Sequence, residues 1–414
     1  MGEFGLPYGR TTLRLSLPDG LAADLIVPPH VPALADPEAA VQQALAGCNL
    51  SRHGGVRSAA IALADKTRPV PHVLLLPPLL AALQALGVPP ARTTLLIGTG
   101  AHPPMVPEEF GCVVPSEILA AYLVRSHDAD DRANLVYLGE TQRGTPVWAN
   151  RRWMEADLRV VLGIVEPHQF VGFSGGAKGA SIGLAGRETI RGNHALLADP
   201  NARMGHYEDN PARQDVEEIG RLMGVHLALN AILDEEGRVA EVLAGPPDEV
   251  IAAGVARVRA LRQVRVPAPY DLVIASAGGH PKDINLYQAQ KALAHASPLV
   301  RDGGTLIVVA ACPEGVGSPE YERWMEGMSS YEAVFERFRR EGFQIGAHKA
   351  YLIARDAARL NVRLVSEMAP SLVRAMLLTP AADLATAVAE ALAALPSGGR
   401  VASMPAAGAM IPVV

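Results

Sequence analysis

The chain has 414 residues, which is typical of a protein of two or three domains with a large buried core. Hydrophobic residues make up 49% of the chain and charged residues 19%, and this balance excludes a disordered or fibrous protein. The net charge is −6, from 37 basic and 43 acidic residues, and the chain has no basic run that would predict a nucleic-acid partner.

The chain contains three cysteines, Cys48, Cys112 and Cys312. They are far apart and form no CxxC motif, so we expect neither a disulfide framework nor a thiolate metal site. The first ten residues lack the charged and apolar regions of a signal peptide, and these features together predict a cytoplasmic protein. Residues 73–91 approach the length of a membrane span, but Pro77 and Pro78 interrupt them. We expect a strand, a loop and a short helix there instead of a membrane segment.

Short β-like segments alternate with helical segments along most of the chain, as in α/β proteins with a parallel sheet. In the first part we expect an edge strand at 11–17, strands that begin the segments 61–65, 93–102 and 158–168, helices at 107–124, 214–224 and 247–263, and strands within 226–245. After a proline-interrupted linker at 264–269, we expect strands in 270–279, 303–315 and 400–406 and helices at 286–296, around 319–341 and at 380–395.

This order predicts two α/β domains with mainly parallel sheets and an active site in the cleft between them. We place the N-terminal domain at residues 1–263 and the C-terminal domain at 270–399. The tail from about 400 to 414 is expected to pack on the N-terminal domain. No short-period repeat interrupts this pattern.

Most of the unusual polar residues lie in four loops that follow predicted strands. In open α/β sheets, ligands bind beyond the carboxyl ends of the strands, so these loops are the first indication of function. Their sequences are DKTRP (65–69), GTGAH (98–102), EPHQFVGFSGGAKG (166–179) and GGHPKDINLYQAQK (278–291).

The first two loops each have a chemical and an ordinary structural interpretation. Arg68 is suited to clamp a carboxylate or phosphate, but it would also fit a solvated turn capped by Asp65. The GTGAH loop presents His102 without forming a GxGxxG dinucleotide fingerprint, and a histidine in such a loop is often structural.

The later motifs are equally open when each is taken alone. Lys178 follows a Ser-Gly-Gly segment without the spacing of a Walker A loop, so a covalent or electrostatic role competes with that of a surface lysine. His194, in the segment GNHALL near an expected helix start, would be a cap neighbour or a metal ligand. Gln288 and Lys291 share one face of a predicted helix, where a solvated face is the alternative.

In this order, the segments DKTRP, GTGAH, EPHQFVGFSGGAKG, GNH and PKDINLYQAQKA resemble the nickel-pincer lactate racemase family. The similarity continues through GGTLIVVAACPEGVGS and GAHKAYLIARDA, and so it covers essentially the whole chain. The family uses a nickel ion held by a pyridinium-3,5-bisthiocarboxylic acid mononucleotide, the nickel-pincer nucleotide, which is joined to a lysine as a thioamide. The resemblance implies that Lys178 carries this cofactor, that His194 is a nickel ligand through Nε2 or Nδ1, and that His102 and His168 form the acid/base pair.

The resemblance also implies the remaining contacts. The cofactor would touch Asp65, Lys66, Thr67 and Arg68, and the substrate would touch Arg68, Tyr287, Gln288, Lys291 and His348. One departure from the family lies in GAHKAY, where the tryptophan that lines the lactate pocket is replaced near His348. This departure leaves the identity of the substrate open.

The implied function is a racemase or epimerase of a small 2-hydroxy acid. It would act by reversible hydride transfer to the cofactor, with two histidines as acid and base. Cofactor-maturation enzymes are the expected partners, and neither nucleic acid nor a membrane is. The first alternative is a non-catalytic protein that binds the nickel-pincer cofactor, which would have no use for both His102 and His168. The second is a nicotinamide-dependent hydroxyacid dehydrogenase, and the missing GxGxxG motif argues against it.

Overall fold

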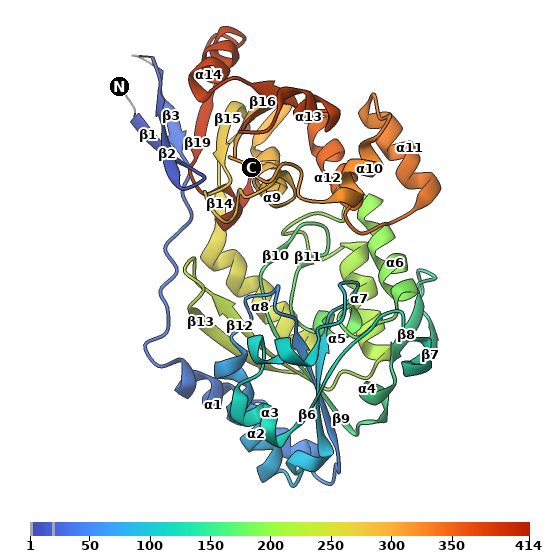
Figure 1. The fold of residues 1–414 in the computed structure, drawn as a ribbon. Helices are drawn as coiled ribbons and strands as arrows, with labels where there is room; N and C mark the ends of the chain where they lie inside the picture. Colours follow the sequence, from blue (N-terminus) through green and yellow to red (C-terminus); the bar gives the residue numbers. More distant parts are fainter. Residues whose placement is uncertain (1–2, 19–20) are drawn as a thin grey trace. The chain divides into compact units, whose positions relative to one another are not determined.

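The computed structural model describes residues 3–18 and 21–414, which divide into two units (Figure 1). The central unit is formed by His30–Leu261, and the terminal unit by the described residues up to Pro29 together with Arg262–Val414. Both units contain a six-stranded, mainly parallel sheet with helices on it, which confirms the predicted α/β class. No helix in the described parts of the chain is long and apolar enough to cross a membrane.

The sheet of the central unit has the order β13-β12-β9-β4-β5-β6, in which only β13 is antiparallel to its neighbour. Its strands are β4 (Ala59–Ala64), β5 (Thr93–Gly98), β6 (Leu123–Ser126), β9 (Leu158–Ile164), β12 (Leu227–Leu233) and β13 (Val239–Gly245). β4 is a continuous apolar run, AAIALA, as expected for a strand of a parallel sheet that helices cover on both faces.

The helices of this unit are α1 (Pro37–Gly47), α2 (His72–Ala85), α3 (Ser116–Ala121), α4 (Arg151–Glu155), α5 (Lys178–Ser181), α6 (Arg187–Ala195), α7 (Pro211–Leu222) and α8 (Pro247–Arg262). Alternate residues of β4 show which helices cover which face of the sheet. Ile61 packs in a cluster with the leucines of α2, whereas Ala60 packs in another cluster with residues of α4, α5 and α7. Two antiparallel pairs complete the unit, β7 (Leu135–Glu140) with β8 (Pro146–Asn150) and β10 (Pro167–His168) with β11 (Gly172–Phe173).

Two local predictions for this unit are wrong. Pro77 and Pro78 lie inside α2, where a strand, a loop and a short helix were expected. A proline inside a helix costs about 3 kcal/mol, but α2 buries five leucines at about 1.5–3 kcal/mol each, and this burial outweighs the cost. The single helix expected at 107–124 is instead a 3₁₀ turn (Pro107–Cys112), the short helix α3 and the start of β6. Pro115 before α3 disfavours helical geometry at the residue that precedes it.

The terminal unit has a fully parallel sheet of order β18-β17-β16-β15-β19-β3. Its strands are β3 (Ala23–Leu25), β15 (Tyr270–Ser276), β16 (Val300–Val309), β17 (Asn361–Val365), β18 (Thr379–Ala381) and β19 (Val401–Met404). Its helices are α9 (Leu286–Ala296), α10 (Pro319–Met325), α11 (Tyr331–Glu341), α12 (His348–Ala357), α13 (Pro370–Ala375) and α14 (Leu384–Ala393). The hairpin of β1 (Glu3–Tyr8) and β2 (Thr11–Ser16) and the pair of β14 (Gln263–Arg265) and β20 (Ile411–Val413) lie outside this sheet.

The structure corrects the expected domain membership of both chain ends. The first 29 residues were expected in the N-terminal domain, but β3 pairs with β19, and Leu15 of β2 packs in one cluster with Leu272 and Ile274. The tail was expected to pack on the same domain, but β19 pairs with β15 and β20 pairs with β14. These segments therefore complete the sheet and core of the terminal unit, because each supplies a strand or an apolar face that this unit lacks without them.

Replacement of Leu15 by alanine tests this assignment. Leu15 is 1% exposed, so the change is expected to lower the free energy of unfolding of the terminal unit by about 2–5 kcal/mol. Amide hydrogen exchange followed by mass spectrometry should become faster in β15 and β16 and stay unchanged in β4 and β5. Leu75→Ala, at a buried position of α2, is the matched control and should show the reverse pattern. Faster exchange of β4 in the Leu15 variant would contradict the assignment.

Candidate active site

A cavity lies in the central unit at the carboxyl ends of β4, β5 and β9. These strands are neighbours in a parallel sheet, so the loops that follow them meet at one edge. Three of the loops singled out in the sequence contribute to the cavity wall, together with β12. The charged and polar residues that line it are Asp65, Arg68, Thr99, His102, Glu166, Ser174, Lys178 and Asn230.

Asp65 and His102 form a hydrogen-bonded pair in this cavity. Asp65 is buried, its Oδ1 accepts hydrogen bonds from the amide and hydroxyl of Thr67, and its Oδ2 lies 2.7 Å from His102 Nδ1. Burial raises the pKa of Asp65, but the hydrogen bonds of His102 and Thr67 outweigh this effect and lower the pKa below its usual value. The carboxylate is therefore ionised at neutral pH and accepts the Nδ1 proton, which leaves the lone pair of the neutral ring on Nε2.

Lys66 does not join this cavity. Its ammonium group pairs with Glu109 at the surface, and this contact raises the pKa of Lys66. The four consecutive residues 65–68 were expected to contact a cofactor. Asp65 and Arg68 line the cavity, and Thr67 is hydrogen-bonded to Asp65.

Lys178 begins α5 directly after a glycine turn that is held from both sides. Gly175 has a φ of +103°, and a Cβ there would lie 2.8 Å from Val165 Cγ2, so the position requires glycine. Arg213 donates from Nη2 to the Gly175 carbonyl at 3.1 Å, and from Nη1 to that of Phe173. On the other side, Asn230 Oδ1 accepts from the amide of Gly176 at 2.7 Å. These contacts set the direction in which the chain enters α5 and so place Lys178.

The amine of Lys178 is strongly perturbed. Burial lowers the pKa of Lys178 to about 7, the charges of Arg68 and Arg213 act in the same direction, and Glu166 opposes them. The Lys178 ammonium group therefore loses its proton far more readily than that of an ordinary lysine, and an uncharged amine is a nucleophile.

His168 and His194 lie on either side of Phe170. The buried Phe170 ring makes edge-to-face contacts with both imidazoles, at centroid distances of 4.9 Å to His168 and 5.0 Å to His194. The amide of Val171 donates to His168 Nδ1 at 3.2 Å, so the neutral ring carries its proton on Nε2. His168 thus presents a donor at Nε2, whereas His102 presents an acceptor at the same atom.

His194 lies in the last turn of α6, although a position near a helix start was expected. The helix begins at Arg187, directly after Gly186, and this early start places His194 at its other end. A histidine in the last turn is favoured there by the partial negative charge of the helix C-terminus.

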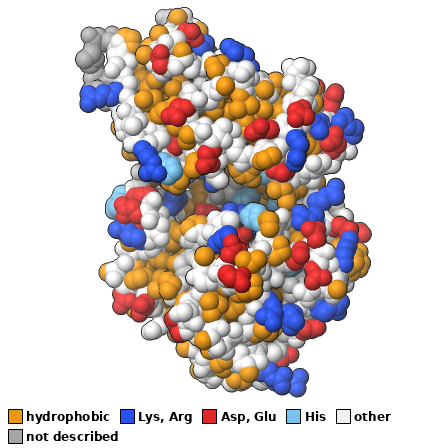
Figure 2. Space-filling view, viewed as in Figure 1, with side chains coloured by type: hydrophobic (Ala, Val, Ile, Leu, Met, Phe, Trp, Pro, Cys, Tyr) orange, Lys and Arg blue, Asp and Glu red, His pale blue; other side chains and the backbone are white. Residues whose placement is uncertain are grey.

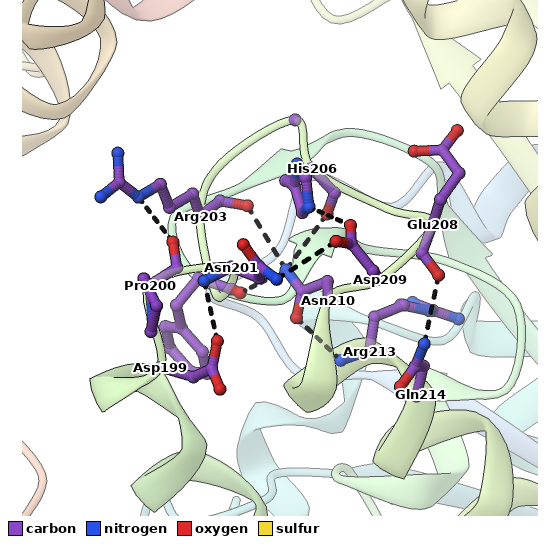
Figure 3. A network of polar contacts seen from close by, with 12 residues as sticks. Asp199, Pro200, Asn201, Arg203, His206, Glu208, Asp209, Asn210, Arg213 and Gln214 are labelled. Carbon is purple, nitrogen blue, oxygen red and sulfur yellow. Dashed lines mark hydrogen bonds and ion pairs between the residues drawn. The ribbon is translucent and has the colours of Figure 1, made fainter.

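The loop that carries His168 is hydrogen-bonded to a second loop, formed by residues 199–210, whose own polar contacts are shown in Figure 3. The buried Asn210 donates from Nδ2 to the carbonyls of Phe170 (2.8 Å) and His206 (3.1 Å), and its Oδ1 accepts from the amide of Arg213. A Cβ on Gly172 would lie 1.9 Å from the His206 carbonyl oxygen, so the two loops approach closely. Four residues that support the loops were not predicted from the sequence: Phe170, Asn210, Arg213 and Asn230. The Asn-Pro pair at the start of α7 indicates a helix cap at Asn210, but it does not indicate that Asn210 also holds the loop of His168.

The other predicted contacts belong to the terminal unit. Tyr287, Gln288 and Lys291 lie on α9. The Tyr287 ring lies 4.7 Å from Lys349 Nζ and 6.1 Å from the ring of His348, which begins α12. Burial, with a contribution from Lys349, lowers the pKa of His348 to about 3, so this ring is neutral. The structure therefore brings Tyr287 and His348 together. Among the described residues of the chain, no group of three or more His, Cys, Asp or Glu side chains is placed to hold a metal ion.

Comparison with known proteins identifies the family of the chain. Residues 8–205 match the family model of the lactate racemase N-terminal domain, and residues 266–411 match that of the lactate racemase C-terminal domain. The chain belongs to the lactate racemase family. This is a family of racemases, and racemases are isomerases.

Two relatives and two solved structures show how far the similarity extends. The lactate racemase of Thermoanaerobacterium thermosaccharolyticum is 28% identical over 94% of both chains, and that of Lactiplantibacillus plantarum is 33% identical over 64% of this chain and 62% of its own. The structure of the lactate racemase apoprotein from T. thermosaccharolyticum matches all of both chains with a TM-score of 0.91 at 27% identity. A protein from Thermotoga maritima shares the fold, with a TM-score of 0.65 at 17% identity over 91% of this chain and 98% of its own.

The perturbed amine of Lys178 predicts a distinctive reactivity profile. Amines acylate as the free base, so labelling of Lys178 by a small water-soluble acylating reagent should rise between about pH 6 and pH 8, with its midpoint near 7. Lys66 is the control within the same chain, because its raised pKa keeps it protonated over this range. Competitive labelling followed by peptide mass spectrometry gives both profiles. A Lys178 profile that coincided with that of Lys66 would contradict the prediction.

Proposed function

We propose that this protein is a racemase or epimerase of a 2-hydroxy acid that uses the nickel-pincer nucleotide joined to Lys178. The observation that carries the proposal is a pair of histidines, His102 with an acceptor and His168 with a donor at Nε2, in the same unit as Lys178, whose amine has a strongly lowered pKa. Lactate, named for the relatives, is the first substrate to test.

The residues present fit such a cofactor. Attachment through a thioamide requires a nucleophilic amine, and Lys178 presents one because its pKa is lowered to about 7. Asn230 is buried in the cavity wall, and its Nδ2 has no hydrogen-bond partner among the described residues. An unsatisfied buried donor costs about 1–3 kcal/mol, so an acceptor atom on a bound ligand is a physical reason to retain it. Arg68 supplies a positive charge to the same cavity for an anionic group.

In this proposal Lys178 holds the cofactor covalently, His194 supplies a nickel ligand, and Asp65, Thr67 and Arg68 complete the contacts. When bound, the group supplies a hydride acceptor for the hydrogen on C2 of the substrate. Lys66 is engaged by Glu109 outside the cavity, and we assign it no contact.

The chain's own residues then handle the proton of the substrate hydroxyl. His102 takes this proton at Nε2, and the ionised Asp65 stabilises the resulting imidazolium through Nδ1–H. His168 in its protonated form returns a proton from Nε2 to the oxygen when the opposite face of the keto acid has been reduced, and its ring is left neutral. In the other direction the two histidines exchange roles, because an imidazole can serve as a base when neutral and as an acid when protonated. Arg68 holds the substrate carboxylate while the carbonyl turns.

The terminal unit contributes substrate contacts in this proposal, from Tyr287, Gln288, Lys291 and His348. The neutral His348 packs against Phe343 at 5.2 Å and lies near Tyr287, so this group presents both apolar and polar surface to a substituent of the substrate. The enzymes that build the cofactor are the proposed partners. On the face that Figure 2 shows, basic and acidic side chains are interspersed, and no large basic surface suited to nucleic acid occurs on it.

The function is tested with protein produced together with the cofactor-building enzymes. Intact mass should show an increment that maps to Lys178, and chiral chromatography should show interconversion of D- and L-lactate or of another pair in a panel of 2-hydroxy acids. Lys178→Ala should lose both the increment and all activity, because the amine that carries the cofactor is removed. Loaded, nickel-containing protein that interconverts no pair would refute the proposal, and a loaded but inactive chain is the result expected of a non-catalytic binding protein.

The two acid/base histidines should behave alike in full turnover and differently in half-reactions. His102→Ala and His168→Ala should each slow racemisation in both directions by about 10²–10⁴-fold, because each direction needs both residues. Each variant should still oxidise the enantiomer whose proton goes to the remaining histidine, and a single-turnover quench would detect the keto acid. His30→Ala, at an exposed histidine paired with Glu235, is the control and should leave the rate unchanged. Near wild-type racemisation by either site variant would contradict the two-histidine mechanism.

A further inference from the structure

The orientation of the Asn193 side chain is determined by its own partners. Asn193 is fully buried on α6, and its Nδ2 donates to the Ala212 carbonyl and to Asp215 Oδ2, both at 2.9 Å. Only the NH₂ end of the amide can donate to these two oxygens, so the opposite end must be the carbonyl oxygen. This oxygen, Oδ1, lies 3.0 Å from His194 Nδ1.

An amide oxygen can only accept a hydrogen bond, and therefore the proton of the neutral His194 ring lies on Nδ1. We infer that Asn193 is a positioning residue that fixes this tautomer and so makes Nε2 the nitrogen that His194 offers to a metal. The part of the inference that concerns the metal rests on the proposed function. The tautomer of His194 does not, because it follows from contacts within the polypeptide. This tautomer also decides which ring nitrogen of His194 would bind nickel, a choice between Nε2 and Nδ1 that the sequence left open.

Asp215 holds Asn193 in this orientation. It is a fully buried carboxylate on α7 whose two oxygens accept from Thr141 Oγ1 at 2.6 Å, from Thr145 Oγ1 at 3.1 Å and from Asn193 Nδ2. Both threonines flank the turn between β7 and β8. A buried carboxylate is costly unless it is fully hydrogen-bonded, and here its three donors connect the β7–β8 turn, α7 and α6 in one network. The amide of Asn193 therefore cannot turn over without breaking two good hydrogen bonds, which is what a ligand-orienting contact requires.

Two substitutions of similar size separate an orienting role from a packing role. Asn193→Leu and Asn193→Asp both remove the Nδ2 donor to Asp215 and Ala212, but only the aspartate keeps an acceptor for His194 Nδ1. In ¹⁵N-histidine-labelled protein without cofactor, at a pH where the rings are neutral, ¹⁵N shifts report which nitrogen of His194 carries the proton; His194→Gln identifies the resonance. We expect the Nδ1–H form in the wild type and in Asn193→Asp, and a major Nε2–H population in Asn193→Leu.

The cofactor-loaded protein gives a second measurement. After dialysis against a chelator, Asn193→Leu should retain nickel about 10–100-fold less well per thioamide-modified chain, and Asn193→Asp should retain it like the wild type. An Nε2–H form in the wild type overturns the inference without recourse to either Asn193 variant, so the inference stays testable even if Asn193→Leu does not fold. Equal nickel retention in the two variants overturns it as well. Loaded wild-type protein that keeps nickel and the Nδ1–H form but racemises nothing would refute the proposed function and leave this inference standing.

Discussion

The turn at Gly175 and Gly176 is the constraint on which the candidate site depends. Lys178 stands at the start of α5, a helix of four residues, which is too short to be stable on its own. Its position is therefore set by the contacts of Arg213 and Asn230 on the turn before it. Arg213 also donates a hydrogen bond to the Phe173 carbonyl, and so the same side chain connects the turn before Lys178 to the loop of His168.

Arg213 has an electrostatic consequence besides this structural one. It is a cation only 1% exposed, and its ion pair with Glu217 makes this burial possible. Its guanidinium lies close enough to Lys178 to disfavour a second positive charge there, in the same direction as the burial of the lysine itself. Arg213 thus both holds the backbone of the glycine turn and lowers the pKa of Lys178, so one side chain couples the position of the lysine to its protonation.

Three histidines of the central unit, His102, His168 and His194, share a mode of support. Each ring is held through Nδ1, by the carboxylate of Asp65 for His102, by a backbone amide for His168 and by the Asn193 oxygen for His194. The chemistry of a neutral imidazole is decided by which nitrogen keeps the proton, and a different partner at Nδ1 decides it differently. An accepting partner leaves a lone pair on Nε2 of His102 and His194, whereas a donating partner leaves a proton on Nε2 of His168. The proposed roles of base, acid and metal ligand correspond to these differences.

The sequence by itself determined the α/β class, the strands that end at the functional loops and, through the order of its motifs, the family. These features follow from local patterns: an apolar run predicts a buried strand, and a strand that ends in Asp65 or in the glycine loop before His102 indicates where a ligand binds. Residues within one loop are close in space whatever the rest of the chain does. Neighbouring parallel strands also end at one edge of the sheet, and for this reason Asp65 and Arg68, in one loop, could be predicted to share a site with His102, in another.

Only the tertiary structure decided which segments complete each unit and which side chains support the site. The pairing of Ala23 with Val401 joins the two ends of the chain, and no local signal specifies such a partner. Pro77 is tolerated in a helix because the leucines around it are buried, and burial is not a property of a local segment. Likewise, Asn193, Arg213 and Asn230 are ordinary polar residues in the sequence. They acquire their roles because folding buries them, and a buried polar group must find a partner among distant parts of the chain.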